Sequence, residues 1–399
     1  MTNFTFNKCS TFGRNIYFDM TFASLGLSAP LLKAILEHQY SEPYPVQIQA
    51  IPSILSGRNI LGIAQTGAGK TASFVLPILE IFQRKRPGRH LYLKVLILVP
   101  TRELAIQIAE VIGDFSKDLP VAVKHNAVFG GVTLNQQMMT LRNTEILVAT
   151  PGRLLDLVST QSINLSKIEI LVLDEADKML DLGFQEEVTK ILALLPPQRQ
   201  NILFSATLDS DSPFIEELKL AKPIKIEIEP DAEYTDLIHQ TAYRVTPENK
   251  GPLLRYLIKT QNMTQVLVFV SSVRTADNLT VKLKKNGIDA TAIHSKKSQT
   301  ARTEALQGFK KGNIRVLVAT DLASRGIDIQ SLPMVINFEL PRSPKDYIHR
   351  IGRTGRAEAS GEAISLICPE DEHHFKIIQK KMGKKVEMIE SAEFVLAGM

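Results

Sequence analysis

The chain has 399 residues, and at roughly 100–200 residues per domain this length predicts two domains. Hydrophobic residues make up 44% and charged residues 22%, which is ordinary for a globular protein, and no apolar run approaches the ~20 residues needed to cross a membrane. Only Cys9 and Cys368 are present, so we expect neither a cysteine zinc cluster nor a disulfide framework. This cysteine usage is typical of proteins in the reducing cytoplasm.

The net charge of +5 is uneven, because residues 231–399 carry +6 and residues 1–230 carry −1. A basic second half is compatible with nucleic-acid binding and equally with a solvated surface. Met1–Asn15 shows no basic start followed by an apolar block, so we expect no secretory signal. Residues 1–20 have no clear period and are expected to form an N-terminal extension.

The first half alternates apolar runs with amphipathic segments. After short helices expected at Leu31–Glu37 and Gln47–Leu55, this alternation predicts a parallel sheet covered by helices on both faces. The expected strands are Ile60–Ile63, Val95–Val99, Ala127–Phe129, Ile146–Ala149, Ile170–Leu173, Asn201–Phe204 and Ile224–Ile228.

A polar, acidic stretch that contains Pro230 separates the two halves. We predict a linker at residues 229–237 between a first domain at 21–228 and a second at 238–399. The α/β alternation then restarts, with strands expected at Val266–Val270, Ala290–Ile293, Val316–Ala319, Val335–Asn337 and Ala363–Ile367.

The first half is organised around the glycine-rich stretch Ala64–Thr71, which follows the strand Ile60–Ile63 and leads into a helix expected at Thr71–Phe82. Backbone N–H groups in such a turn line a cavity for oxyanions, and the helix adds its positive N-terminal end. On the loop alone, a chance glycine turn is the alternative. The residues expected to bind nucleotide phosphates are Thr66, Gly67, Ala68, Gly69, Lys70 and Thr71, with Lys70 on the β- and γ-phosphates and the Thr71 hydroxyl on Mg²⁺.

Carboxylates follow the strand Ile170–Leu173 in the run Asp174–Asp177. A carboxylate at the carboxyl end of an apolar strand, downstream of a phosphate loop, is where Mg²⁺ is held in this class of fold. We predict that Asp174 contacts the metal and that Glu175 polarises the water that attacks the γ-phosphate.

With these motifs in this order, the chain resembles the DEAD-box RNA helicases from Phe22 to about Cys368, in a compact, bacterial-type form. The stretch Tyr40–Gln47 looks like the family's adenine-reading motif, and the resemblance implies that Phe22, Tyr40 and Gln47 bind near the base. Gln39 stands where Gly is common and Tyr44 where Thr is common. A shifted backbone at these positions would weaken adenine selectivity.

Several short motifs at strand ends resemble the family's RNA-contacting elements. Hydroxyls, glycine N–H groups and arginines suit phosphate contacts, and the chain has no Trp to stack on bases. We therefore expect RNA binding that is independent of base sequence. The residues that the resemblance assigns to RNA are Pro100, Thr101, Arg102, Gly130, Gly131, Thr150, Pro151, Gly152, Arg153, Arg302 and Thr320.

The second half has no phosphate loop and carries instead two arginine-rich stretches, Ala323–Asp328 and His349–Arg356. Arginines at this density suit oxyanion recognition. The resemblance implies that Arg356 is an arginine finger toward the γ-phosphate, supported by Arg353 and Arg325. It also implies that Asp328 binds the ribose and that His349 helps to place the attacking water.

The implied fold belongs to the α/β class, with two tandem RecA-like domains joined by a short linker. The implied function is an ATP-dependent RNA helicase that uses ATP and Mg²⁺, acts as a cytoplasmic monomer without membrane contact, and relies on protein partners for targeting. Two alternatives are an ATP-gated RNA clamp whose hydrolysis times release, and a DNA helicase or translocase.

Overall fold

In the computed structural model, the described residues are 20–64, 68–84, 92–206, 214, 218, 222–228, 238–321, 332–355 and 361–391. The chain divides into two compact units. The first comprises Met1–Pro100, Ile108–Val128 and Thr140–Ile228, and the second Thr101–Gln107, Phe129–Met139 and Glu229–Met399. The linker predicted at residues 229–237 lies outside the described residues and stays a prediction.

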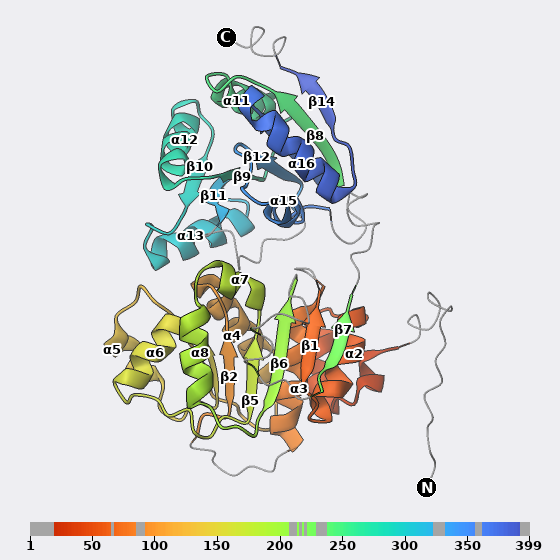
Figure 1. Cartoon of the computed structure of the whole chain (residues 1–399), viewed down its shortest axis with the longest axis vertical. Coiled ribbons are helices and arrows are strands. Elements are labelled where there is room, and N and C mark those ends of the chain that lie inside the picture. Colours follow the sequence, from red (N-terminus) through yellow and green to blue (C-terminus); the bar gives the residue numbers. More distant parts are fainter. Residues whose placement is uncertain are drawn as a thin grey trace. The chain divides into compact units, whose positions relative to one another are not determined.

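The first sheet has seven strands, and all of its neighbouring strands are parallel (Figure 1). Parallel neighbours require crossover connections, which the intervening helices supply. Strands β2, β4 and β5 are buried along their whole length, which explains their uninterrupted apolar sequences. In sheet order the strands are β3 (His125–Val128), β4 (Ile146–Ala149), β2 (Val95–Leu98), β5 (Ile170–Leu173), β6 (Gln200–Ser205), β1 (Ile60–Ile63) and β7 (Ile224–Glu227).

Gly62 in β1 allows the first sheet to pack closely. A Cβ at this position would lie 2.3 Å from the ring of Phe204 in the neighbouring strand, and that ring lies 5.9 Å from the ring of Phe74. Among the described residues of the first half, the helices are η1 (Phe22–Leu25), α1 (Ala29–Glu37), α2 (Pro45–Leu55), α3 (Lys70–Arg84), α4 (Arg102–Ser116), α5 (Leu134–Thr140), α6 (Pro151–Ser159), α7 (Ala176–Asp181) and α8 (Gln185–Leu194).

The second sheet also has seven parallel strands. In sheet order they are β10 (Ala290–Ile293), β11 (Val316–Thr320), β9 (Val266–Val270), β12 (Met334–Asn337), β13 (Gly361–Ile367), β8 (Ile238–Arg244) and β14 (Glu387–Glu390). The helices in the described part of this half are α11 (Lys250–Thr260), α12 (Val273–Lys285), α13 (Gln299–Lys310), α15 (Pro344–Ile351), η2 (Pro369–Asp371) and α16 (Glu372–Met382).

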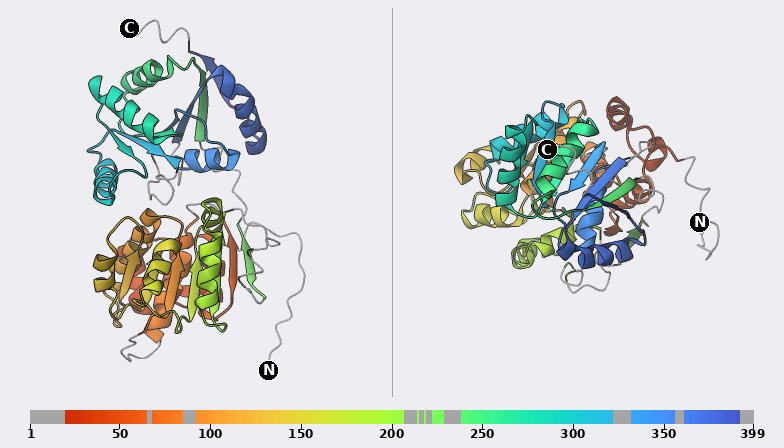
Figure 2. Two further views of the ribbon diagram at one scale, coloured as in Figure 1. Left: turned by 60° about the vertical axis from the view of Figure 1, so that its left-hand side comes forward. Right: turned by 90° about the horizontal axis from the view of Figure 1, so that it is seen from above.

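Helices cover both faces of the second sheet (Figures 1 and 2). Val266, Val268 and Val270 of β9 join a core with apolar side chains of α11 and α12. Leu267 and Phe269 point to the other face and pack with α13, and α15 and α16 pack nearby on residues of β8 and β13. The two side-chain sets of β9 therefore alternate between the faces, as the strand period requires.

Every predicted strand is present, with ends moved by at most two residues. The predictions omitted β8 and β14. Within the described ranges, no helix is both long and apolar enough to cross a membrane.

Candidate nucleotide and RNA sites

The carboxyl ends of the first-sheet strands carry most of the predicted site residues, because the strands all run in the same direction. Lys70 begins α3 after β1, the Asp174 carboxylate follows β5, and Thr101 and Thr150 follow β2 and β4. Strand direction alone thus brings the phosphate-loop lysine, the acidic pair and the predicted RNA-contacting turns to one edge of the sheet.

Lys70 is buried, with 7% of its surface exposed. Its Nζ donates a hydrogen bond to the carbonyl of Ala64 at 3.1 Å, which holds the side chain against the residue that follows β1. Gly69 adopts φ +81, where a side chain is strained. A Cβ at Gly69 would also lie 2.6 Å from Nε2 of Gln47 and 2.8 Å from the ring of Tyr44, so only glycine fits between the loop and the adenine motif.

Gln47 is completely buried, and its amide is already engaged. Its Nε2 donates to the carbonyl of Gly69 at 3.1 Å, and its Oε1 accepts from the N–H of Tyr44 at 2.9 Å. An amide offers two donors and two lone pairs, so capacity for a nucleobase remains. In this conformation, however, the side chain ties the predicted adenine motif to the phosphate loop.

Aromatic side chains stack beside this motif. The ring of Tyr40 lies 6.4 Å from that of Phe22 and 5.6 Å from that of Phe115, in edge-to-face geometry both times. The preceding residue, Gln39, adopts φ +60, the left-handed conformation that glycine takes easily. The turn is therefore formed by a strained non-glycine residue, at a cost of about 1–2 kcal/mol, and the effect of Gln39 on adenine selectivity stays a prediction.

Asp174 is 3% exposed. Burial raises the pKa of its carboxyl to about 6, against the opposing attraction of Lys70. Its Oδ1 accepts from the N–H of Glu175 at 3.0 Å. No cluster of three or more His, Cys, Asp or Glu side chains fit to hold a metal occurs in the described part of the chain. The buried carboxylate of Asp174 fits Mg²⁺, which keeps several waters and binds through one or two carboxylates plus phosphates.

Glu175 precedes α7 with φ +52 and ψ +48. A left-handed glutamate is sparsely populated and costs of order 1–3 kcal/mol. Such a conformation persists only where the surrounding structure holds the backbone in place, and it is found most often at functional sites. The strain therefore supports the sequence-based role of Glu175 as the water-polarising residue.

The turns predicted to contact RNA in the first half have local features suited to backbone phosphates. Gly131 has φ +84 and lies against the guanidinium of Arg102. Thr150 is the N-cap of α6 and its hydroxyl makes no capping bond to the helix. Of the remaining predicted residues of this group, Pro100, Thr101 and Gly130 follow β2 and β3, whereas Pro151, Gly152 and Arg153 form the first turn of α6.

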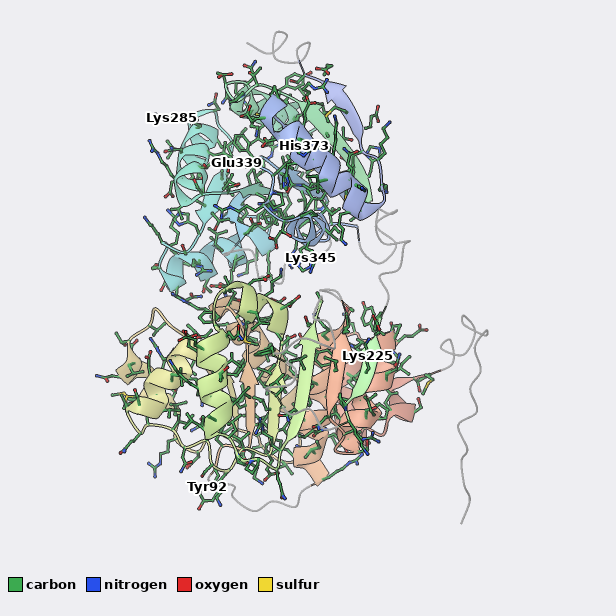
Figure 3. The ribbon with its side chains drawn as sticks, in the orientation of Figure 1. Tyr92, Lys225, Lys285, Glu339, Lys345 and His373 are labelled. Atoms are coloured by element: carbon green, nitrogen blue, oxygen red, sulfur yellow. The ribbon has the colours of Figure 1, made fainter. Side chains whose placement is uncertain are left out.

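In the second half, a buried network contains a residue that the sequence did not single out. Arg350 of α15 is 2% exposed, and its guanidinium donates to both carboxylate oxygens of Asp321 at 2.6 and 2.8 Å. It also donates to Oδ1 of Asn337 and to the carbonyl of Glu339, at 3.1 and 2.6 Å (Glu339 is labelled in Figure 3). Its guanidinium carbon lies 4.9 Å from the Phe269 ring centre.

This network joins α15, the helix that carries His349, to Asp321, which directly follows the last residue of β11, Thr320. Arg302 lies on α13, which begins after the N-cap Ser298, and Arg353 follows α15 with 9% of its surface exposed. The predicted residues Thr66, Gly67, Arg325, Asp328 and Arg356 lie outside the described residues.

Two RecA-like domains in tandem, the first with a phosphate loop, define a class of nucleotide-driven motor ATPases. Two family models match the chain, DEAD/DEAH box helicase over residues 44–213 and the helicase conserved C-terminal domain over residues 249–358. The chain belongs to the DEAD-box family of superfamily 2 helicases.

Relatives and solved structures agree with this assignment. The chain is 39% identical over 362 residues to the ATP-dependent RNA helicase CshA of Limosilactobacillus reuteri, covering 90% of this chain and 72% of that protein. It is 36% identical over 375 residues to the DEAD-box ATP-dependent RNA helicase RhpA of Helicobacter pylori, covering 94% and 75%. The structure of S. cerevisiae Dbp5 bound to RNA and ADP BeF3 matches with a TM-score of 0.81 and 29% identity, covering 95% and 97%.

Proposed function

We propose that this ATP-dependent RNA helicase is an RNA-stimulated ATPase that opens short RNA duplexes locally. The observation that carries the proposal is a buried Lys70 whose positive charge acts on the buried Asp174 carboxyl, on the same sheet edge as Thr101 and Thr150. The names of CshA and RhpA, and the RNA and ADP BeF3 in the Dbp5 structure, support the same reading.

In the proposed reaction the first half holds the nucleotide. Lys70 and the loop N–H groups bind the β- and γ-phosphates, Gln47 reads the adenine edge, and Glu175 polarises the attacking water. Mg²⁺, held by Asp174 and Thr71 with phosphate oxygens and water, would neutralise the charge on the phosphates.

The second half supplies positive charge for the transition state. We assign Arg356 as the finger, with Arg353, Arg325 and His349 in support and Asp328 on the ribose. A finger contributes about 10³–10⁵ in rate in comparable enzymes, so neither half is sufficient. If RNA binds motifs of both halves, linkage requires ATP and RNA to strengthen each other's binding, typically by about 1–3 kcal/mol.

The test is steady-state ATP hydrolysis by the full chain without nucleic acid, with single-stranded RNA, and with single-stranded DNA of equal length. We expect strong stimulation by RNA alone. Equal stimulation by DNA would favour a DNA translocase, and full activity without nucleic acid would contradict coupling between RNA and hydrolysis.

The second candidate is an ATP-gated RNA clamp, whose hydrolysis only times release. The same site chemistry serves both functions, so strand displacement on a short RNA duplex separates them.

We further propose that the protein is a cytoplasmic monomer and that protein partners direct it to its RNA. Light scattering of the purified chain tests the monomeric state.

A further inference from the structure

The second unit contains a cavity at the end of the sheet opposite to Thr320 and Asp321. It has a volume of about 690 Å³, within the ~300–1,000 Å³ typical of ligand pockets. Its walls are alternate residues along β8 and β14, residues near the start of β12 and β13, and the loop of residues 261–265 that leads from α11 into β9. All of these elements belong to one unit, and none of the predicted ATP or RNA residues lines the cavity.

The register of the strands explains why side chains of one kind face this cavity. Thr241 of β8 pairs with Glu387 of β14 and with Ile364 of β13, and Glu362 pairs with His239. Residues two apart on a strand share a face. Buried apolar side chains therefore form the floor of the cavity, and carboxylates and amides form its rim. Among the lining residues there is no Lys or Arg.

The cavity is therefore acidic within the more basic half of the chain. No ion pair joins Glu362 or Glu387 to a cation in the described part of the structure. Burial raises the pKa of the Tyr243 hydroxyl in this cavity, and the negative charges of Glu362 and Glu387 raise that pKa further. A phosphate or a nucleic-acid backbone would be repelled here, whereas an ammonium or guanidinium group would be attracted.

A second observation concerns the strand beside the cavity. Strand β14 is the last strand of the sheet order and pairs on one side only, with β8, among the described residues (Figure 1). Such an edge offers backbone N–H and C=O groups to an added strand. A peptide that adds to β14 would project every second side chain onto the face of Glu387 and Ile389, which both line the cavity.

We propose that this edge and cavity form a docking site for an extended segment of a partner protein, which adds as a strand to β14 and places a Lys or Arg side chain in the acidic cavity. The recognised pattern is a basic residue next to Glu387 and an apolar residue two positions away, next to Ile389. The site is separate from ATP and RNA binding, so it serves recruitment.

The probe is a fluorescent peptide, Thr-Lys-Thr-Val-Thr-Lys-Thr, titrated with the full chain at low salt and followed by anisotropy. Glu387→Gln and Glu362→Gln should each weaken binding about tenfold, the magnitude of one charge-assisted hydrogen bond. The matched control Glu186→Gln, on α8 of the first half, should leave binding unchanged. All three variants should keep wild-type RNA-stimulated ATP hydrolysis, which reports on folding.

Backbone pairing is tested with peptides N-methylated at alternate residues. Methylation of the set that faces β14 should abolish binding, while methylation of the other set should not. Equal binding of both methylated peptides, with competition by spermidine, would overturn strand addition and leave a small-cation site. Binding that is absent, or unaffected by Glu387→Gln, would overturn the docking site altogether.

Discussion

Removing the buried charge at Asp174 should stabilise the protein without its ligands. The pKa of this carboxyl is raised from 3.8 to about 6 by burial, so the folded chain holds the proton at pH values where the unfolded chain has lost it. The stability that this group contributes is complete below about pH 4 and is lost as the pH rises through 6. A shift of about two units corresponds to about 3 kcal/mol at pH 8.

Asparagine has the shape of the protonated acid, keeps an oxygen for the N–H of Glu175, and does not titrate. Asp174→Asn should therefore be more stable than the wild type by about 3 kcal/mol at pH 8 and by about half of that at pH 5. The assay is urea unfolding of both full chains, followed by circular dichroism in EDTA without nucleotide. Only the transition of the first unit should move.

Two results would refute this reasoning. A stability difference that is the same at both pH values would mean that the titration of Asp174 does not set it. A variant less stable than the wild type at pH 8 would mean that the attraction of Lys70 exceeds the desolvation cost. Adding ATP and Mg²⁺ should reverse the order, because the metal favours the charged carboxylate that only the wild type has.

Four further predictions test other contacts. Glu175→Gln should bind ATP and RNA but hydrolyse about 10²–10⁴ times more slowly in single turnovers, and wild-type turnover would remove its assigned role. Gly62→Ala should destabilise the first unit by about 1–3 kcal/mol in urea, because the new Cβ meets Phe204 at 2.3 Å; Phe204→Leu in the same chain should recover part of the loss. Asp321→Asn should destabilise the second unit by up to about 3 kcal/mol, since Arg350 keeps its burial and loses its charge partner, and an unchanged urea midpoint would contradict this. The logarithm of RNA affinity should fall with the logarithm of salt with a slope near −3, for about four phosphate contacts, and a slope near zero would exclude backbone binding.

The strands were predictable where they are buried on both faces. Ile146–Ala149 and Ile170–Leu173 have the predicted bounds, because a strand covered on two sides needs an unbroken apolar run. Strand β14 was missed since Glu387–Glu390 lies at the edge of the sheet, with an exposed glutamate at each end and half-buried residues only between them. A four-residue strand with two apolar residues carries too little apolar signal to be separated from a loop.

The candidate site was predictable where a motif is continuous in sequence. The phosphate loop and the acidic pair are short runs placed at strand ends, and strand direction then brings them together. Arg350 was missed because its partner Asp321 is 29 positions away, and no sequence spacing shows that two charged residues share a buried contact. Only the folded chain shows that this arginine holds α15 to the end of β11.

The buried amide of Gln47 makes the two nucleotide motifs depend on each other. Its bond to the carbonyl of Gly69 fixes the last turn before Lys70, and its bond to Tyr44 fixes the start of α2. These two bonds leave the amide one donor and one lone pair, so a nucleobase bound by the predicted adenine motif would contact the same side chain that holds the phosphate loop. Glycine at position 69 makes this possible, because any side chain there would separate the two motifs.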